Sequence, residues 1–281
     1  MHRNYLASTA FCPDTSGSRK NGKYFPTIQL TDGARVEQTT HAQEALEWWT
    51  LESRFWDLFR RLYEFRWTQK QNQSSEQTDP SLEETRIILT WLVDHAPRST
   101  DDEYIQSNRW MYTREDIKLR KLNPRHVPSN NNIITELDPD APLRQGKTLH
   151  PDDEAPEQTL LKQIFSFIRR GDIKKAQEIC RDANAHWRAA SLSGVPEDGT
   201  TLNNGWRKAC LQIARQGQVD RMERAIYGAI CGDLDSVTPV CGTWEDLLWA
   251  HYNTIYTWKL EEVRYLSIFL LTGEENEADD G

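Results

Sequence analysis

Apolar side chains recur at three- and four-residue steps along most of the sequence, which is the period of one face of an α-helix. The first such stripe comprises Ala45, Trp48, Trp49, Phe55, Trp56, Phe59, Leu62 and Tyr63. A capping-box pattern at Thr40–Gln43 precedes it. Similar patterns at Ser81 and Thr100 start two further helices, and Pro97 ends the first of these. Because no stretch alternates between apolar and polar positions, the sequence predicts an all-α fold.

A second pattern repeats in the C-terminal half: a glycine, a polar residue, and an aliphatic residue that begins a new stripe. It occurs at Gly171, Gly217 and Gly232. Glycine readily takes the left-handed conformation that closes a helix, and Asp172 and Asp233 are suited to cap the helix that follows. Short turns of this kind join antiparallel helices, so we expect stacked helical hairpins. The glycines are unequally spaced, which favours an irregular α-solenoid over a strict tandem repeat.

The last helical stretch is apolar around much of its circumference. Thr243 is the predicted cap, with Asp246 at the third position, and the pattern gives one helix over 244–256 and another over 259–271 that ends at Gly273. A solenoid helix this apolar usually lies beneath another layer. We therefore expect the chain to be part of a longer protein.

Within residues 244–256 we expect Trp244, Leu248 and Tyr252 to form one continuous stripe, with Trp249 off it. Two alternatives remain for the second face. It is buried inside this chain, or it contacts a partner or a further domain. The candidate partner contacts are Trp244, Leu248, Trp249, Tyr252 and Tyr256.

The six prolines within residues 124–158 argue against helix there, since an interior proline costs about 3 kcal/mol. Composition alone indicates a linker. The predicted organisation is an irregular N-terminus over 1–38, N-terminal helices over 39–123, an extended proline-rich segment over 124–158, a helical solenoid over 159–272 and an acidic tail over 273–281. We expect these parts to form one continuous solenoid unit.

The charge balance bears on the class of partner. The chain has 34 Lys plus Arg against 43 Asp plus Glu, a net charge of −9, which argues against nucleic-acid binding. The basic stretch around Arg207 and Arg215 is interleaved with Asp220 and Glu223 and does not change this conclusion. No apolar run approaches the roughly 18 residues of a membrane span. Five cysteines without a CxxC pair favour a reducing compartment.

The sequence offers no catalytic motif. The histidines have no zinc-binding spacing with one another or with the cysteines, and no phosphate-binding glycine motif is present. We interpret Cys231 and Cys241 as small core residues and His251 as a solvent-facing or core histidine. Most tryptophans, among them Trp187 and Trp206, are interpreted as core residues. We therefore expect no enzyme activity, no catalytic or metal-binding residue and no cofactor.

Several long strings agree in order and spacing with a known family. They are ITELDPDAPLRQ (134–145), FSFIRRGDIKKAQEIC (165–180), HWRAASLSG (186–194), WRKACLQIA (206–214), ERAIYGAICGDL (223–234) and PVCGTWEDLLWAHYN (239–253). Together they resemble the nucleoporin eighty-four / one hundred and seven family, part of the stem of the Y-shaped scaffold complex of the nuclear pore. The resemblance covers roughly residues 45–270.

The resemblance implies an α-solenoid of the ancestral coatomer element type that acts as a structural scaffold at the nuclear pore, in the nuclear envelope, and supports transport of protein and mRNA. It implies a neighbouring stem nucleoporin as partner, itself helical and bound to a β-propeller subunit, and a second partner site in a C-terminal half absent here. It also implies an extended segment docked on the solenoid. That segment comprises Glu136, Leu137, Asp138, Pro139, Asp140, Pro142, Leu143 and Arg144.

Two other classes remain open from the residues themselves. One is an α-solenoid adaptor of a vesicle coat or another large assembly, which differs in partner rather than in physics. The other is a helical enzyme, which would need a polar cleft with convergent titratable groups. The 134–145 string favours the nuclear pore.

Overall fold

The computed structural model describes residues 19–20, 23–24, 32–71, 79–97, 109–123, 132–195 and 203–277. Helix accounts for 79% of this described part, which confirms the predicted all-α class. The chain divides into two compact units, residues 1–57 and residues 58–281. None of the described helices combines the length and the apolar character needed to cross a bilayer.

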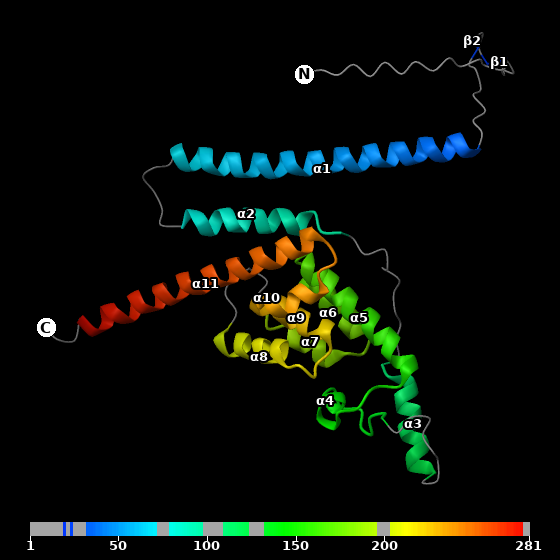
Figure 1. The fold of residues 1–281 in the computed structure, drawn as a ribbon. Helices are drawn as coiled ribbons and strands as arrows, with labels where there is room; N and C mark the ends of the chain where they lie inside the picture. Colours follow the sequence, from blue (N-terminus) through cyan, green and yellow to red (C-terminus); the bar gives the residue numbers. More distant parts are fainter. Residues whose placement is uncertain are drawn as a thin grey trace. The chain divides into compact units, whose positions relative to one another are not determined.

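The described elements follow one another as a series of helices after a short antiparallel strand pair (Figure 1). They are β1 Arg19–Lys20, β2 Lys23–Tyr24, α1 Asp32–Gln71, α2 Pro80–Asp94, α3 Met111–Leu122, α4 Ala141–Gln145, α5 Pro151–Arg169, α6 Ile173–Asp182, α7 His186–Leu192, α8 Asn204–Arg215, α9 Arg221–Cys231, α10 Leu234–Val237, the 3-10 turn Thr238–Val240 and α11 Trp244–Glu277.

The core of the second unit forms around α5, which packs against α6 and α9, while α8 packs on α9 and α7 on α6 (Figure 1). Leu161 and Ile164 of α5 are fully buried there, together with Leu192 of α7. Alanine and cysteine are among the fully buried core residues, as at Ala176 and Cys210. Small side chains let neighbouring helix backbones approach, so each hairpin buries its stripe against the next.

Two of the three predicted glycine turns have the expected conformation. Gly171 and Gly232 lie in the left-handed region with φ of 70° and 77°, and Asp172 caps α6 by accepting a hydrogen bond from the Lys175 backbone at 3.2 Å. The third turn differs, because Gly217 is not among the described glycines with positive φ. There α9 begins later, at a cap formed by Asp220, whose carboxylate accepts from the backbone amides of the first turn.

The N-terminal helices begin at other residues than predicted. α1 begins at Asp32, so residues 32–38 are helical rather than irregular, and Thr40 lies inside the helix. α2 begins at Pro80, and its cap is Asp79, which accepts from the Ser81 backbone at 3.0 Å. Proline favours the first helical position because it has no N–H to satisfy. The predicted start at Thr100 lies outside the described residues, and α3 begins only after Trp110.

The capping pair in front of α11 is confirmed, because Thr243 and Asp246 exchange hydrogen bonds between side chain and backbone at 3.1 and 3.2 Å. The division of the following stretch is wrong. α11 is one continuous helix to Glu277, and Gly273 neither ends it nor begins a non-helical tail. A single glycine costs only about 1 kcal/mol inside a helix, which helix-forming neighbours can offset.

The described part of the proline-rich segment, which begins at residue 132, is folded. Ile133 forms an isolated bridge with Thr148, both Ile133 and Ile134 are fully buried, and the short helix α4 lies between. The expectation that 124–158 excludes helix is wrong at α4 and again from residue 151 onward, where α5 starts. Pro151 occupies the first turn, and Pro156 removes one backbone donor from a helix whose other face is deeply buried.

A buried carboxylate anchors the start of α5. Asp153 accepts hydrogen bonds from the Thr113 backbone amide at 2.6 Å and from the Thr113 hydroxyl at 2.7 Å. Thr113 itself is fully buried, and its hydroxyl also accepts from the backbone amide of His150 at 2.9 Å. Charge-assisted bonds of this kind are stronger than neutral ones. They fix α3 to the start of α5, which helps to place the segment 132–150 that leads into this helix.

Candidate partner-binding surfaces

The predicted contact face of α11 is divided by the fold. Trp249, which sequence placed off the core stripe, is 3% exposed. Its ring packs edge-on against Phe165 of α5 with centroids 6.1 Å apart, and the Arg169 guanidinium lies 5.0 Å from the ring centroid. Trp244, placed on the core stripe, is 64% exposed. Trp249 is thus buried inside this chain, which is the first of the two alternatives, whereas Trp244 is exposed at the start of its stripe.

The other predicted contact residues on α11 are intermediate in exposure. Leu248 and Tyr252 are half-buried against the core cluster. Tyr256 is half-buried too, and burial raises the pKa of its hydroxyl, with Arg86 opposing that rise. These residues bridge the core and the surface, and they do not form one exposed patch with Trp244.

Arg169 explains why the Trp249 side of α11 faces inward. This buried guanidinium donates to the Asp246 carboxylate at 3.1 Å and to the Leu92 carbonyl at 2.8 Å. Burial lowers the pKa of Arg169, and Asp246 acts against that shift. A buried cation needs such partners, because leaving it unpaired is strongly destabilising. Its bonds fix α2, α5 and α11 to one another.

The segment predicted to be extended is ordered, but only in part extended. Ala141 is fully buried and Leu143 half-buried, whereas Leu137 is 38% exposed. Residues 141–144 form most of α4, which corrects the extended prediction for Pro142, Leu143 and Arg144. Arg144 bonds to Glu136 and Asp138, and the bond to Asp138 is the main cause that raises its pKa.

A row of exposed aromatic side chains runs along the second half of α1. Phe59, Tyr63 and Trp67 are 52%, 55% and 54% exposed. Their rings stack in sequence, with centroids 6.2 Å apart for the first pair and 6.1 Å for the second. We call these three residues the aromatic row. Sequence found the stripe that contains Phe59 and Tyr63 but gave no reason to separate them from the core.

The bonds between α1 and α2 come from other residues. Arg61 bonds to Asp94 at 2.8 Å, Arg66 bonds to Glu84 at 2.8 Å, and Leu58 packs against the core cluster. Positions 59, 63 and 67 lie four residues apart and share one face, and all three are exposed. In the first unit, residues 40–57 of α1 carry further exposed apolar side chains, namely Leu46, Trp48, Trp49, Leu51, Phe55 and Trp56.

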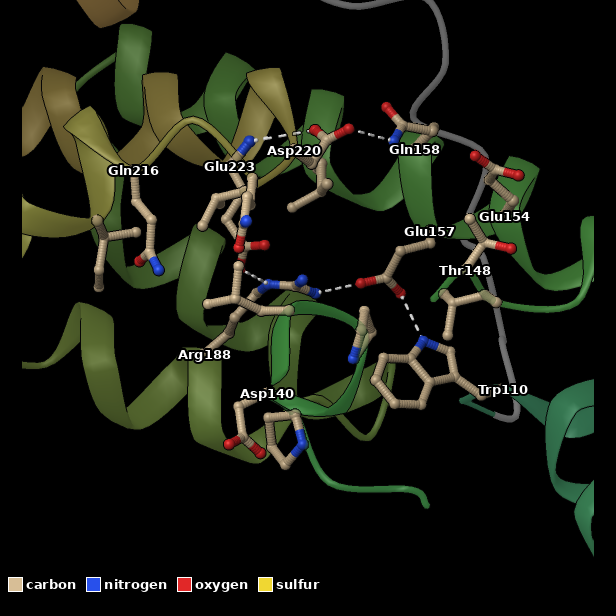
Figure 2. A pocket seen from close by; sticks show the side chains of 18 of the residues that line it. Trp110, Asp140, Thr148, Glu154, Glu157, Gln158, Arg188, Gln216, Asp220 and Glu223 are labelled. Atoms are coloured by element: carbon tan, nitrogen blue, oxygen red, sulfur yellow. Dashed lines mark hydrogen bonds and ion pairs between the residues drawn. The ribbon is translucent and has the colours of Figure 1, made fainter. Parts of the chain in front are cut away.

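A cavity of about 580 Å³ opens between α5, α7, α9 and the segment 139–149. Arg188 of α7 lies in its wall and bonds to Glu157 at 2.7 Å and to Glu223 at 3.1 Å (Figure 2). Burial by itself lowers the pKa of Arg188, and the two carboxylates more than offset this, so that the net shift is upward. Glu157 also accepts from the Trp110 indole at 3.3 Å. This charged group is thus satisfied within the chain.

The interpretation of the cysteines and of His251 agrees with the structure. Cys180, Cys210 and Cys231 are buried in the core cluster, and Cys241 is half-buried against it. Burial raises the pKa of the Cys210 thiol to about 12. His251 is exposed. Among the described residues, no group of three His, Cys, Asp or Glu side chains has the arrangement of a metal site.

Two arginines of the basic stretch form contacts within the chain. Arg215 bonds to Asp233 at 3.0 Å, which takes this carboxylate away from its predicted capping role, since α10 has no side-chain cap. Arg224 donates to the Ala214 carbonyl at 2.8 Å. Trp187 and Trp206 are half-buried, between the core and surface positions considered for them. The structure therefore gathers no basic patch from Arg215 and Arg224.

Similarity to known proteins shows to which family the chain belongs. The family model described as nuclear pore protein 84 / 107 matches residues 46–267. The chain is 35% identical to nucleoporin nup107 of Schizosaccharomyces pombe over 249 residues, which cover 78% of this chain and 30% of that protein. It is 32% identical to nuclear pore complex protein Nup107 of Homo sapiens over 220 residues, covering 71% of this chain and 24% of that protein.

Nucleoporin NUP84 of Chaetomium thermophilum is 30% identical over 279 residues, covering 80% of this chain and 29% of that protein. The chain thus spans less than a third of the length of each of these three relatives. The matches run through the helices that build the core, from the aromatic row on α1 to α11. On these grounds the chain belongs to the nuclear pore protein 84 / 107 family.

Proposed function

We propose that this chain is a structural scaffold at the nuclear pore, in the nuclear envelope, and acts as a stem component of the Y-shaped complex. Its role is to hold other nucleoporins in place without enzyme activity, and so to support transport of protein and mRNA. Family membership supports the pore over a vesicle-coat adaptor. The observation that carries the scaffold role is the exposed aromatic row on α1.

The proposed partner is the neighbouring stem nucleoporin, itself helical and carrying a β-propeller subunit. Large aromatic side chains each bury about 150–250 Å² and dominate interface energetics, and tyrosine and tryptophan are enriched among the residues that contribute most to binding. The spacing of Phe59, Tyr63 and Trp67 suits a helix laid along α1. Trp244 at the start of α11 is a second proposed contact, because it too is exposed.

Co-purification with that nucleoporin, followed by affinity measurement, tests the proposal. We expect the paired change Tyr63→Ala and Trp67→Ala to raise Kd by about 30-fold or more, since central interface aromatics cost 2 kcal/mol or more when truncated. Tyr265→Ala is the matched control, because Tyr265 is an exposed aromatic on a different helix. Circular dichroism confirms that each variant is folded.

Unchanged affinity of the paired variant, in a folded protein, would exclude the aromatic row as the contact. The coat alternative is tested separately by the location of the tagged full-length protein. Fluorescence at the nuclear rim supports the pore, whereas fluorescence on transport vesicles alone contradicts it.

A further inference from the structure

The cavity beside Arg188 has the dimensions and walls of a binding site that the scaffold role does not use. Its volume of about 580 Å³ lies in the range of ligand pockets, which is about 300–1,000 Å³. It is enclosed by α5, α7, the segment 139–149 and the stretch 213–227, together with Trp110 in front of α3. All of them belong to the second unit, so the site is complete within it.

The charge of the walls is unbalanced. Five carboxylates line the cavity, namely Asp140, Glu154, Glu157, Asp220 and Glu223, against the cations Lys147 and Arg188. Arg188 is already shared by two of these carboxylates. Both Asp140 and Glu154 are exposed. Asp140 lies 3.9 Å from the Arg144 guanidinium, so Glu154 is the carboxylate that is more available to a guest. The surplus favours a cation.

The remaining walls favour an apolar group and a peptide backbone. Leu143, Leu149 and Val219 supply aliphatic surface, and Trp110 supplies an aromatic ring (Figure 2). Trp187 also lines the cavity, although its indole nitrogen is not exposed to solvent.

Two side-chain amides in the wall can form hydrogen bonds with a peptide backbone. Gln216 and Gln218 lie in the stretch between α8 and α9 that lines the cavity, and both are exposed. Each amide offers a donor and an acceptor, as a peptide backbone does. A nucleic acid is disfavoured here, because its phosphates would face the carboxylates.

We propose that this cavity binds a short segment of a partner polypeptide in which an arginine or lysine lies beside an apolar side chain. The cation faces Glu154 and Asp140, the apolar side chain enters between Leu143 and Val219, and the peptide backbone bonds to the side-chain amides of Gln216 and Gln218. This contact is separate from the one proposed on α1. Its test uses no nucleoporin, so either proposal can fail without the other.

Titration of the isotope-labelled chain with short peptides tests the proposal. The probe is acetyl-Leu-Arg-Leu-Arg-amide, and the comparison peptides are acetyl-Leu-Glu-Leu-Glu-amide and acetyl-Ser-Arg-Ser-Arg-amide. Nuclear magnetic resonance follows the indole N–H signals of Trp110 and Trp187. We expect saturable shifts of these signals with the first peptide at millimolar concentrations, weaker binding in high salt, and far weaker binding of the other two peptides.

Rim variants locate the binding. Asp140→Asn and Glu154→Gln are each expected to raise Kd about two- to fivefold, the effect of one exposed ion pair. Glu178→Gln on α6 is the control, because Glu178 is exposed and does not line the cavity. Absence of saturable shifts, equal binding of the acidic peptide, or equal Kd in the rim variants and the wild type overturns the proposal.

Discussion

Trp249 provides the sharpest test of how the second unit is packed, because its burial was decided by the fold. The side chain is 3% exposed, lies edge-on to Phe165 and carries the Arg169 guanidinium 5.0 Å from its ring centroid. Trp249→Ala removes this ring and leaves a void beside a buried cation. Truncation of a buried aromatic costs about 3–5 kcal/mol, and loss of the ring pair alone accounts for about 0.5–1.5 kcal/mol of it.

The matched control is Trp244→Ala, one and a half turns earlier on the same helix and 64% exposed. It should change the free energy of unfolding by no more than about 0.5 kcal/mol. Urea unfolding followed by far-ultraviolet circular dichroism measures both, and the midpoint should fall for Trp249→Ala at an unchanged slope. If the two variants are equally stable, or if Trp244→Ala is the worse, then α11 packs in a different rotation and the argument from Arg169 fails.

Three further predictions concern turns, thiols and the α5 anchor. Gly232→Ala should destabilise the chain by about 1–3 kcal/mol, because φ is 77° and the new Cβ would lie 2.9 Å from the Thr257 side chain, whereas Gly217→Ala has open space and should be neutral; equal melting temperatures would contradict this. The free energy of unfolding should fall as pH rises from about 9 to about 12, because burial raises the pKa of the Cys210 thiol and only the unfolded state ionises in that window; a Cys210→Ala variant should lose part of that slope, and an identical slope would refute the assignment. Asp153→Asn weakens two charge-assisted hydrogen bonds and should lower stability by about 1–3 kcal/mol, with faster amide exchange in α3 as the local readout and unchanged exchange there as the contrary result.

Local pattern was enough to predict much of the helical framework. The three- and four-residue period gave the all-α class, and the Thr243–Asp246 pair and Asp172 form the caps that their spacing predicted. Gly171 and Gly232 take the left-handed conformation expected of them. Capping and turn conformation depend on neighbours within a few residues, so the sequence alone contains the interaction that decides them.

The candidate surfaces were only partly visible in the sequence. The stripe on α1 was recognised, but nothing local distinguishes a buried Trp from an exposed one at the same spacing. Phe59 and Tyr63 are exposed, and the ion pairs between α1 and α2 come from Arg61 and Arg66 instead. The cavity has no sequence signature either, since its walls come from parts of the chain between residues 110 and 227.

What the sequence determined by itself was therefore the period of the helices, their caps and two of their turns. The tertiary structure decided which face of α11 is inside, because apolar residues cover most of its circumference and the period leaves the rotation open. That rotation is set by Arg169, whose partners Leu92 and Asp246 are both 77 residues away along the chain. The tertiary structure also decided that the proline-rich segment is docked, through the contact between Asp153 and Thr113, which are 40 residues apart. A buried charge must find its partners wherever the fold brings them, and a local pattern cannot specify contacts at that distance.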